Sequence, residues 1–164
     1  MTVWIGSLVF VAWTTTVAMS DLRHRRVSNA LVVAGLMAAF ACAFTTRLPF
    51  GVAPAQAALG ALCGLAALLP FFALRMMGAA DVKVFAVLGA WCGAHALLDL
   101  WVVASILAGL HACALLIMTR LRFAAPGHGG VPVPALHRHR ATPYVTCLAV
   151  PALGMLALRH LGGV

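Results

Sequence analysis

The sequence predicts an all-α membrane protein, a bundle of six transmembrane helices that forms one domain over residues 1–164. Of its 164 residues, 64% are hydrophobic and only 9% are charged, against roughly 25% charged residues in an average soluble domain. A helix needs about 20 mainly apolar residues to cross a bilayer. Such stretches follow one another so closely that little chain remains for a soluble domain.

The apolar stretches place the six helices at about 3–20, 29–46, 56–74, 76–95, 97–118 and 143–159. The fourth depends most on inference, because its uninterrupted apolar run, 84–94, is too short to span a membrane. We therefore expect it to begin near residue 76 and to carry Asp81 and Lys83 in its first turns. A segment rich in Pro and Gly, 120–142, predicts a cytoplasmic loop before the last helix.

The positions of the basic residues predict the orientation in the membrane. With the N-terminus outside, all Lys and Arg residues except Arg47 and Arg159 fall on the cytoplasmic side, as the positive-inside rule requires. The run DLRHRR follows the first apolar stretch, which argues against a cleaved signal peptide, since those carry positive charge before the apolar region. The net charge of +8 is thus assigned to topology and to anionic lipid headgroups, and no nucleic-acid partner is expected.

Cysteine and histidine give no clear sign of a metal or cofactor. The five cysteines are widely spaced in apolar stretches without a CxxC pair, which favours buried hydrophobic roles over disulfide or metal roles. His128, His137 and His139 lie in the predicted loop, but Arg138 and Arg140 interleave with the last two and would repel a cation. We therefore expect neither a metal site nor a cofactor.

Two glycine pairs have the spacing that lets helices approach closely in lipid. They are Gly60-xxx-Gly64 in the third predicted helix and Gly89-xxx-Gly93 in the fourth. The spacing is typical of helix packing in membranes, but the chain contains 15 Gly residues and such pairs also arise from abundance. Both interpretations remain open at this stage.

Carboxylate chemistry is restricted to three side chains, Asp21, Asp81 and Asp99, because the chain contains no Glu. An ionised Asp at the bilayer centre costs about 2.5 to 3.5 kcal/mol, so acids in or beside such helices are functional candidates. In the predicted topology Asp21 ends the first helix and Asp81 opens the fourth, both on the cytoplasmic side. Asp99 follows Asp81 by about 27 Å of helical path and is expected near the outer face.

Asp21 and Asp81 are therefore candidates for a catalytic pair across a cleft open to the cytoplasm. Two carboxyl groups in contact do not readily ionise together, so the pKa of one is raised and the pair shares a proton. The ionised member then takes a proton from attacking water while the other donates to a peptide carbonyl. Structural roles also remain open, with Arg25 as a helix-end partner of Asp21 and Lys83 partly offsetting Asp81.

The sequence resembles the aspartic prepilin peptidases, the type IV leader peptidases of bacteria and archaea, and especially the short forms that serve tight-adherence (Flp) pili. The resemblance rests on DLRHRRVSN from Asp21 to Asn29, on GAADVK from Gly78 to Lys83, on Pro143-Tyr144, and on the six-helix frame. It implies a bundle similar to GxGD-type intramembrane aspartic proteases. It also implies that Asp21 and Asp81 are catalytic and that the motif or substrate-binding positions are Gly78, Ala80, Lys83, Asn29 and Tyr144.

The chain departs from the family pattern at two positions. Ala80 replaces the second Gly of GxGD, and Ser28 replaces a Pro that is common before the Asn. Ala would be strained at a positive φ and is favourable in a helix. The paired CxxC insertion of larger family members is absent, so N-methylation of the cleaved product is not expected.

The resemblance implies a prepilin substrate with a short basic leader, cut at the cytoplasmic face of the bacterial cytoplasmic membrane without a cofactor. Two alternatives remain open. One is an intramembrane aspartic protease with other substrates. The other is a non-catalytic scaffold or ion-coupled transporter that uses Asp81 as a cation site, although the six helices show no obvious inverted repeat. The sequence leaves the oligomeric state open.

Overall fold

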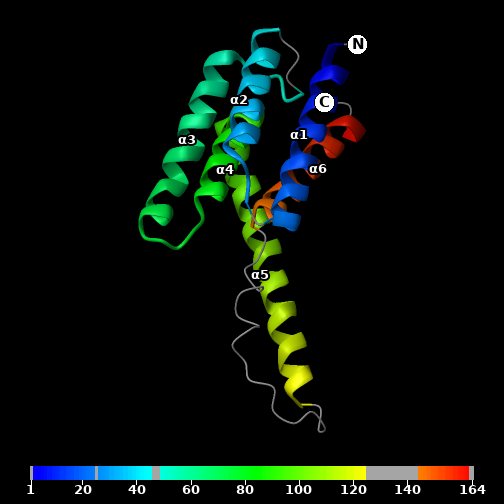
Figure 1. Cartoon of the computed structure of the whole chain (residues 1–164). Coiled ribbons are helices and arrows are strands. Elements are labelled where there is room, and N and C mark those ends of the chain that lie inside the picture. The colour runs from blue at the N-terminus through cyan, green and yellow to red at the C-terminus, as the bar shows by residue number, and fades with distance from the viewer. Residues whose placement is uncertain (1, 25, 46–48, 125–143, 163–164) are drawn as a thin grey trace.

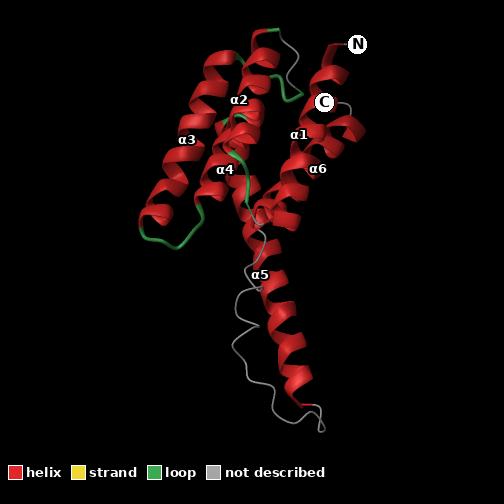
Figure 2. Ribbon diagram, viewed as in Figure 1, coloured by secondary structure: helices red, strands yellow, loops and turns green. Residues whose placement is uncertain are grey.

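The computed structural model describes residues 2–24, 26–45, 49–124 and 144–162, which form six helices and no strand (Figures 1 and 2). The helices are α1 (Thr2–His24), α2 (Asn29–Phe44), α3 (Pro54–Ala73), α4 (Ala79–Cys92), α5 (Ala94–Ala124) and α6 (Tyr144–Gly162). The predicted all-α architecture and the order of the elements are confirmed.

Four of the described helices, α1, α3, α5 and α6, are long and apolar enough to cross a membrane. The other two are shorter, with 16 residues in α2 and 14 in α4. At 1.5 Å per residue α4 is about 21 Å long, against about 30 Å for the hydrocarbon core. A full set of six membrane crossings and an external N-terminus therefore stay predictions.

The predicted bounds of the fourth helix and of the long loop need correction. The helix begins at Ala79 instead of near residue 76, because Gly78 is its extended N-cap residue, and it ends at Cys92, because Gly93 takes a φ of +81°. The predicted loop starts too early, since α5 continues to Ala124. The rest of that loop, with its three histidines, lies outside the described residues.

The helices pack in two connected groups. α3 lies against α4, α1 lies against α6, and α5 contacts α3, α4 and α6 before it extends beyond the bundle (Figure 1). The start of α1 and the end of α6 lie at one end of the bundle. The end of α1 and the starts of α2, α4 and α6 lie toward the other end, and this arrangement brings the functional motifs together.

α4 is the most buried element of the core. Most of its residues from Val82 onward are buried, and the ring of Trp91 packs 5.3 Å from that of Phe10 in α1. Many large apolar side chains elsewhere point outward, such as Leu8, which is 68% exposed, and Met37, which is also 68% exposed. Apolar side chains on the outer surface and a packed centre are what a membrane-embedded bundle requires.

Small residues set the close contact between α3 and α4. A Cβ atom added to Gly60 would clash with the carbonyl oxygen of Gly89, and one added to Gly64 would lie 2.9 Å from the carbonyl oxygen of Phe85. The packing interpretation is thus confirmed for three of the four glycines in the predicted pairs. The fourth, Gly93, instead provides the positive φ that ends α4.

Candidate active site

Asp21 is buried in the last turn of α1, with 7% of its surface exposed. Its Oδ2 atom accepts hydrogen bonds from the backbone N–H and from the hydroxyl of Thr146, each at 3.1 Å. Thr146 is the third residue of α6, and the first four N–H groups of a helix lack partners within it. Asp21 therefore supplies an acceptor that α6 needs, at the positive end of the α6 dipole.

Asp81 is the third residue of α4 and is partly buried. Its Oδ2 accepts a hydrogen bond from the backbone N–H of Gly78 at 3.1 Å. A Cβ atom at position 78 would lie 3.1 Å from that same oxygen, so glycine leaves room for the carboxylate. The carboxyl groups of Asp21 and Asp81 lie close enough to interact electrostatically, and the two predicted acids are thus brought together.

Ala80, which replaces the second Gly of the family motif, sits in the helical backbone of α4. Within the described residues, Arg75 is the only non-glycine residue with a positive φ. Ala80 is therefore unstrained and has a better helix propensity than Gly. It also packs against the hydrophobic core. The structure thus accommodates this departure from the family pattern.

Asn29 and Lys83 lie on different helices and contact each other directly. The Nζ atom of Lys83 donates a hydrogen bond to Oδ1 of Asn29 at 2.8 Å, which joins the start of α2 to the first turns of α4. Ser28, which stands where Pro is common, caps α2 by accepting a hydrogen bond from the N–H of Leu31 at 3.3 Å. Arg25, the suggested helix-end partner of Asp21, lies outside the described residues.

Tyr144 opens α6 beside the pair of acids. Its hydroxyl is buried and makes no hydrogen bond of standard geometry with the described residues. It faces Ser105 of α5 and lies within electrostatic range of Asp81. The motif position predicted at Tyr144 is therefore at the candidate site.

Two polar residues at the site, Thr146 and Ser105, were not predicted from the sequence. Thr146 follows Pro143-Tyr144 in the first turn of the last predicted helix, at the depth of Asp21. This position in the sequence is a signal that could have identified Thr146 as a partner of Asp21. Ser105 interrupts a long apolar run and carries no motif. Only the contact between α5 and α6 shows that it belongs here.

The remaining acid and the metal-binding side chains are not part of this arrangement. Asp99 has an exposed side chain in the second turn of α5 and is not among the groups that perturb Asp81. The described residues contain no group of three or more His, Cys, Asp or Glu side chains that could hold a metal ion. The cysteines are free thiols, and Cys147 lies within electrostatic range of Asp21.

The fold and this site define an apolar helical bundle with two interacting carboxyl groups at one end, contributed by α1 and α4 and supported by α6. A family model described as the type IV leader peptidase family matches residues 8–113, which include Asp21, Asn29 and Asp81. The chain belongs to the type IV leader peptidase family. Membership indicates a protease of the prepilin peptidase kind, and with the apolar helices it indicates a membrane protein. Comparison with curated proteins and with solved structures gives no match.

Proposed function

We propose that the protein is an aspartic endopeptidase of the bacterial cytoplasmic membrane that removes the short basic leader from type IV or Flp prepilins at the cytoplasmic face. The observation that carries this proposal is the proximity of Asp21 and Asp81, which are separated by sixty residues in the chain and lie on different helices. Family membership supports the kind of reaction. The pair of carboxyl groups supports water activation as its mechanism.

The two acids have different surroundings, which supports different roles. Asp21 receives two hydrogen bonds from Thr146, and donors of this kind favour an ionised carboxylate. Asp81 is partly buried away from solvent, receives only one hydrogen bond, from Gly78, and faces the charge of Asp21. We therefore assign Asp21 as the ionised general base and Asp81 as the protonated general acid.

The reaction then follows the chemistry of two carboxyl groups that share one proton. Asp21 takes a proton from water as the water oxygen bonds to the scissile carbonyl carbon, and Asp81 protonates the carbonyl oxygen. The C–N bond then breaks as Asp21 returns its proton to the leaving amine and Asp81 recovers its own. In the described part of the chain the Oδ1 atoms of both acids accept no hydrogen bond, which leaves one oxygen of each for water and substrate.

The distribution of basic residues between the two ends of the bundle supports a cytoplasmic location for the candidate site. Arg23 and Arg26 flank the end of α1, and Arg75 lies between α3 and α4, at the end of the bundle that carries Asp21 and Asp81. Arg159 lies near the end of α6, at the opposite end of the bundle. Basic residues concentrate on the cytoplasmic side of membrane proteins. A prepilin whose apolar helix remains in the membrane would present its basic leader at this depth.

The test is co-expression with the cognate prepilin, in which removal of the leader is detected as a shift in the electrophoretic mobility of the pilin. Asp21→Asn and Asp81→Asn should each abolish processing while the protein still inserts into the membrane. Asp99→Asn is the matched control, since it removes an exposed acid of the same type and should leave processing intact. Normal cleavage by either of the first two variants would refute this mechanism, and pilus assembly by the double variant would favour a scaffold.

A further inference from the structure

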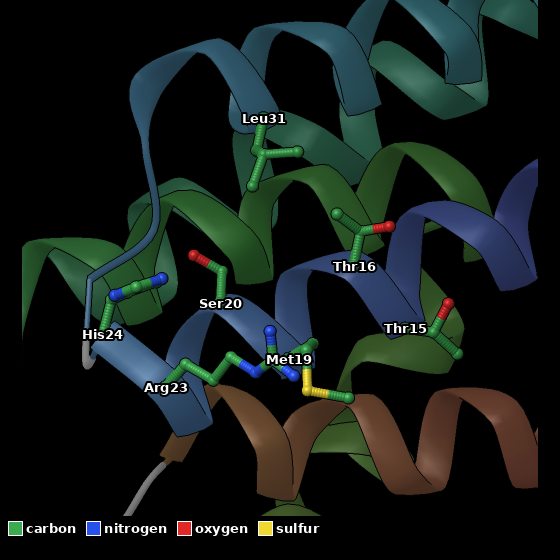
Figure 3. Close-up of a pocket in the computed structure, with 7 residues that line it drawn as sticks. All are labelled: Thr15, Thr16, Met19, Ser20, Arg23, His24 and Leu31. Carbon is green, nitrogen blue, oxygen red and sulfur yellow. The ribbon is translucent and has the colours of Figure 1, made fainter.

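A second pocket, separate from the two acids, lies between the end of α1 and the start of α2. Its volume is about 500 Å³. Figure 3 shows His24, Ser20 and the base of the Arg23 side chain toward one end, with the Arg23 guanidinium reaching toward Met19, and Thr15 and Thr16 toward the other end. The residues that matter here are Arg23 and His24 at the charged end, Met19 and Leu31 in the middle, and Thr15 and Thr16 at the far end.

The chemistry of the lining favours an anion at the charged end. The Thr15 hydroxyl donates to the carbonyl oxygen of Val11 at 2.7 Å, and the Thr16 hydroxyl donates to that of Ala12 at 2.6 Å. The hydroxyl of Ser20, also in the lining, donates to the carbonyl oxygen of Arg26 at 2.8 Å. These hydroxyl protons are committed to the backbone.

The side-chain donors that remain for a ligand in this lining are therefore the cationic guanidinium of Arg23 and the ring of His24. None of the three acids of the chain lines the pocket. A guanidinium presents several N–H donors in a geometry that suits phosphate. The charged end therefore matches a phosphate group.

The length of the pocket distinguishes a lipid from a small anion. Thr15 and His24 are separated by about 13 Å along α1, whereas each headgroup layer of a bilayer is only about 5 to 8 Å thick. A pocket with its charged end at the end of a membrane helix therefore continues into the hydrocarbon. A free phosphate would cover only the charged end and leave the wall of Met19 and Leu31 exposed.

We propose that this pocket binds one anionic phospholipid, with its phosphate on Arg23 and His24 and an acyl chain along Met19 and Leu31. The lipid would contact both α1 and α2. The indole N–H of Trp13 already joins these helices by donating to the carbonyl oxygen of Leu31 at 2.9 Å. The proposal does not depend on the proteolytic function, because lipid binding is measured without any substrate.

The experiment is native mass spectrometry of the full-length protein in a neutral detergent, titrated with phosphatidylglycerol or with phosphatidylcholine. We expect one retained phosphatidylglycerol and much weaker retention of phosphatidylcholine. Loss of the cationic Arg23 and of the ring donor of His24, in the double variant Arg23→Gln/His24→Gln, should weaken phosphatidylglycerol binding at least about 5-fold. Arg75→Gln is the charge control, because Arg75 is exposed at the same end of the bundle and does not line the pocket.

A second variant tests the apolar wall independently of charge. Met19 is 51% exposed, so Met19→Trp should fill the pocket without disturbing the core, and it should reduce lipid retention at unchanged net charge. Unchanged helical circular dichroism and elution volume would verify folding of each variant. Equal retention of the two lipids, an equal loss in Arg75→Gln, full retention by Met19→Trp, or displacement of the lipid by millimolar inorganic phosphate would each overturn the proposal.

Discussion

The hydroxyl of Thr146 offers the sharpest test of how Asp21 acts. It lies 3.1 Å from Oδ2 of Asp21 and 3.5 Å from the carbonyl oxygen of Ala18, so its proton is directed mainly at the carboxylate. Thr146→Val removes this donor and keeps the backbone N–H and the shape of the side chain. A hydrogen bond to a charged group is worth about 1.5 to 3 kcal/mol. Without this contribution the shared proton moves toward Asp21, the state with Asp21 free to act as base becomes rarer, and the rate falls by up to about 10- to 150-fold.

The assay is the initial rate of leader removal from a purified prepilin by the full-length enzyme in lipid vesicles. Thr146→Ser keeps the hydroxyl and removes the methyl group, so it should retain most of the wild-type rate. If Thr146 mattered only through packing of its methyl group, Thr146→Ser would be slow as well. Thermal unfolding of both variants serves as the control for packing. A wild-type rate in Thr146→Val would refute the assignment of Asp21 as a base supported by Thr146, and equally slow Ser and Val variants would assign the effect to packing.

Three further predictions concern the frame that holds the site. Gly60→Ala should lower the free energy of unfolding by about 1 to 3 kcal/mol through overpacking, measured by denaturant titration. The matched control Gly109→Ala should leave the free energy of unfolding unchanged, because an added Cβ there meets nothing within 4 Å. Ala80→Gly should destabilise α4 by up to about 1 kcal/mol without speeding leader removal, and a faster enzyme would contradict the unstrained geometry of Ala80. Lys83→Met and Asn29→Ala should each weaken the contact between α2 and α4, and the double variant should lose less stability than the sum of the two. Strict additivity would show that the hydrogen bond contributes nothing.

Hydropathy and charge predicted a large part of this architecture. Long apolar stretches locate the helices because burial of backbone polar groups in lipid leaves few alternatives to helix. The same patterns placed Asp21 and Asp81 at one depth. They did not locate the ends of α4, because those depend on Gly78 as an N-cap and on the positive φ of Gly93. Local backbone conformation of this kind leaves little trace in hydropathy.

The site itself was only half predictable. A carboxylate in an apolar chain is conspicuous because it is costly, so both acids were identified. Thr146 was missed because a threonine near a helix start is commonplace, and its role depends on a partner 125 residues away in the chain. The contact between Lys83 and Asn29 was missed for the same reason, although both positions were expected to matter.

The hydrogen bonds between Asp21 and Thr146 also set a time at which the proposed enzyme becomes active during its synthesis. Thr146 is made 125 residues after Asp21, which at about 5 to 20 residues per second is a delay of roughly 6 to 25 s. Throughout that interval α1 carries a carboxylate without the two donors that hold it in the finished fold. A nascent chain that has completed α1 to α5 therefore has both acids but lacks the helix that orients one of them, and proteolysis must wait for α6.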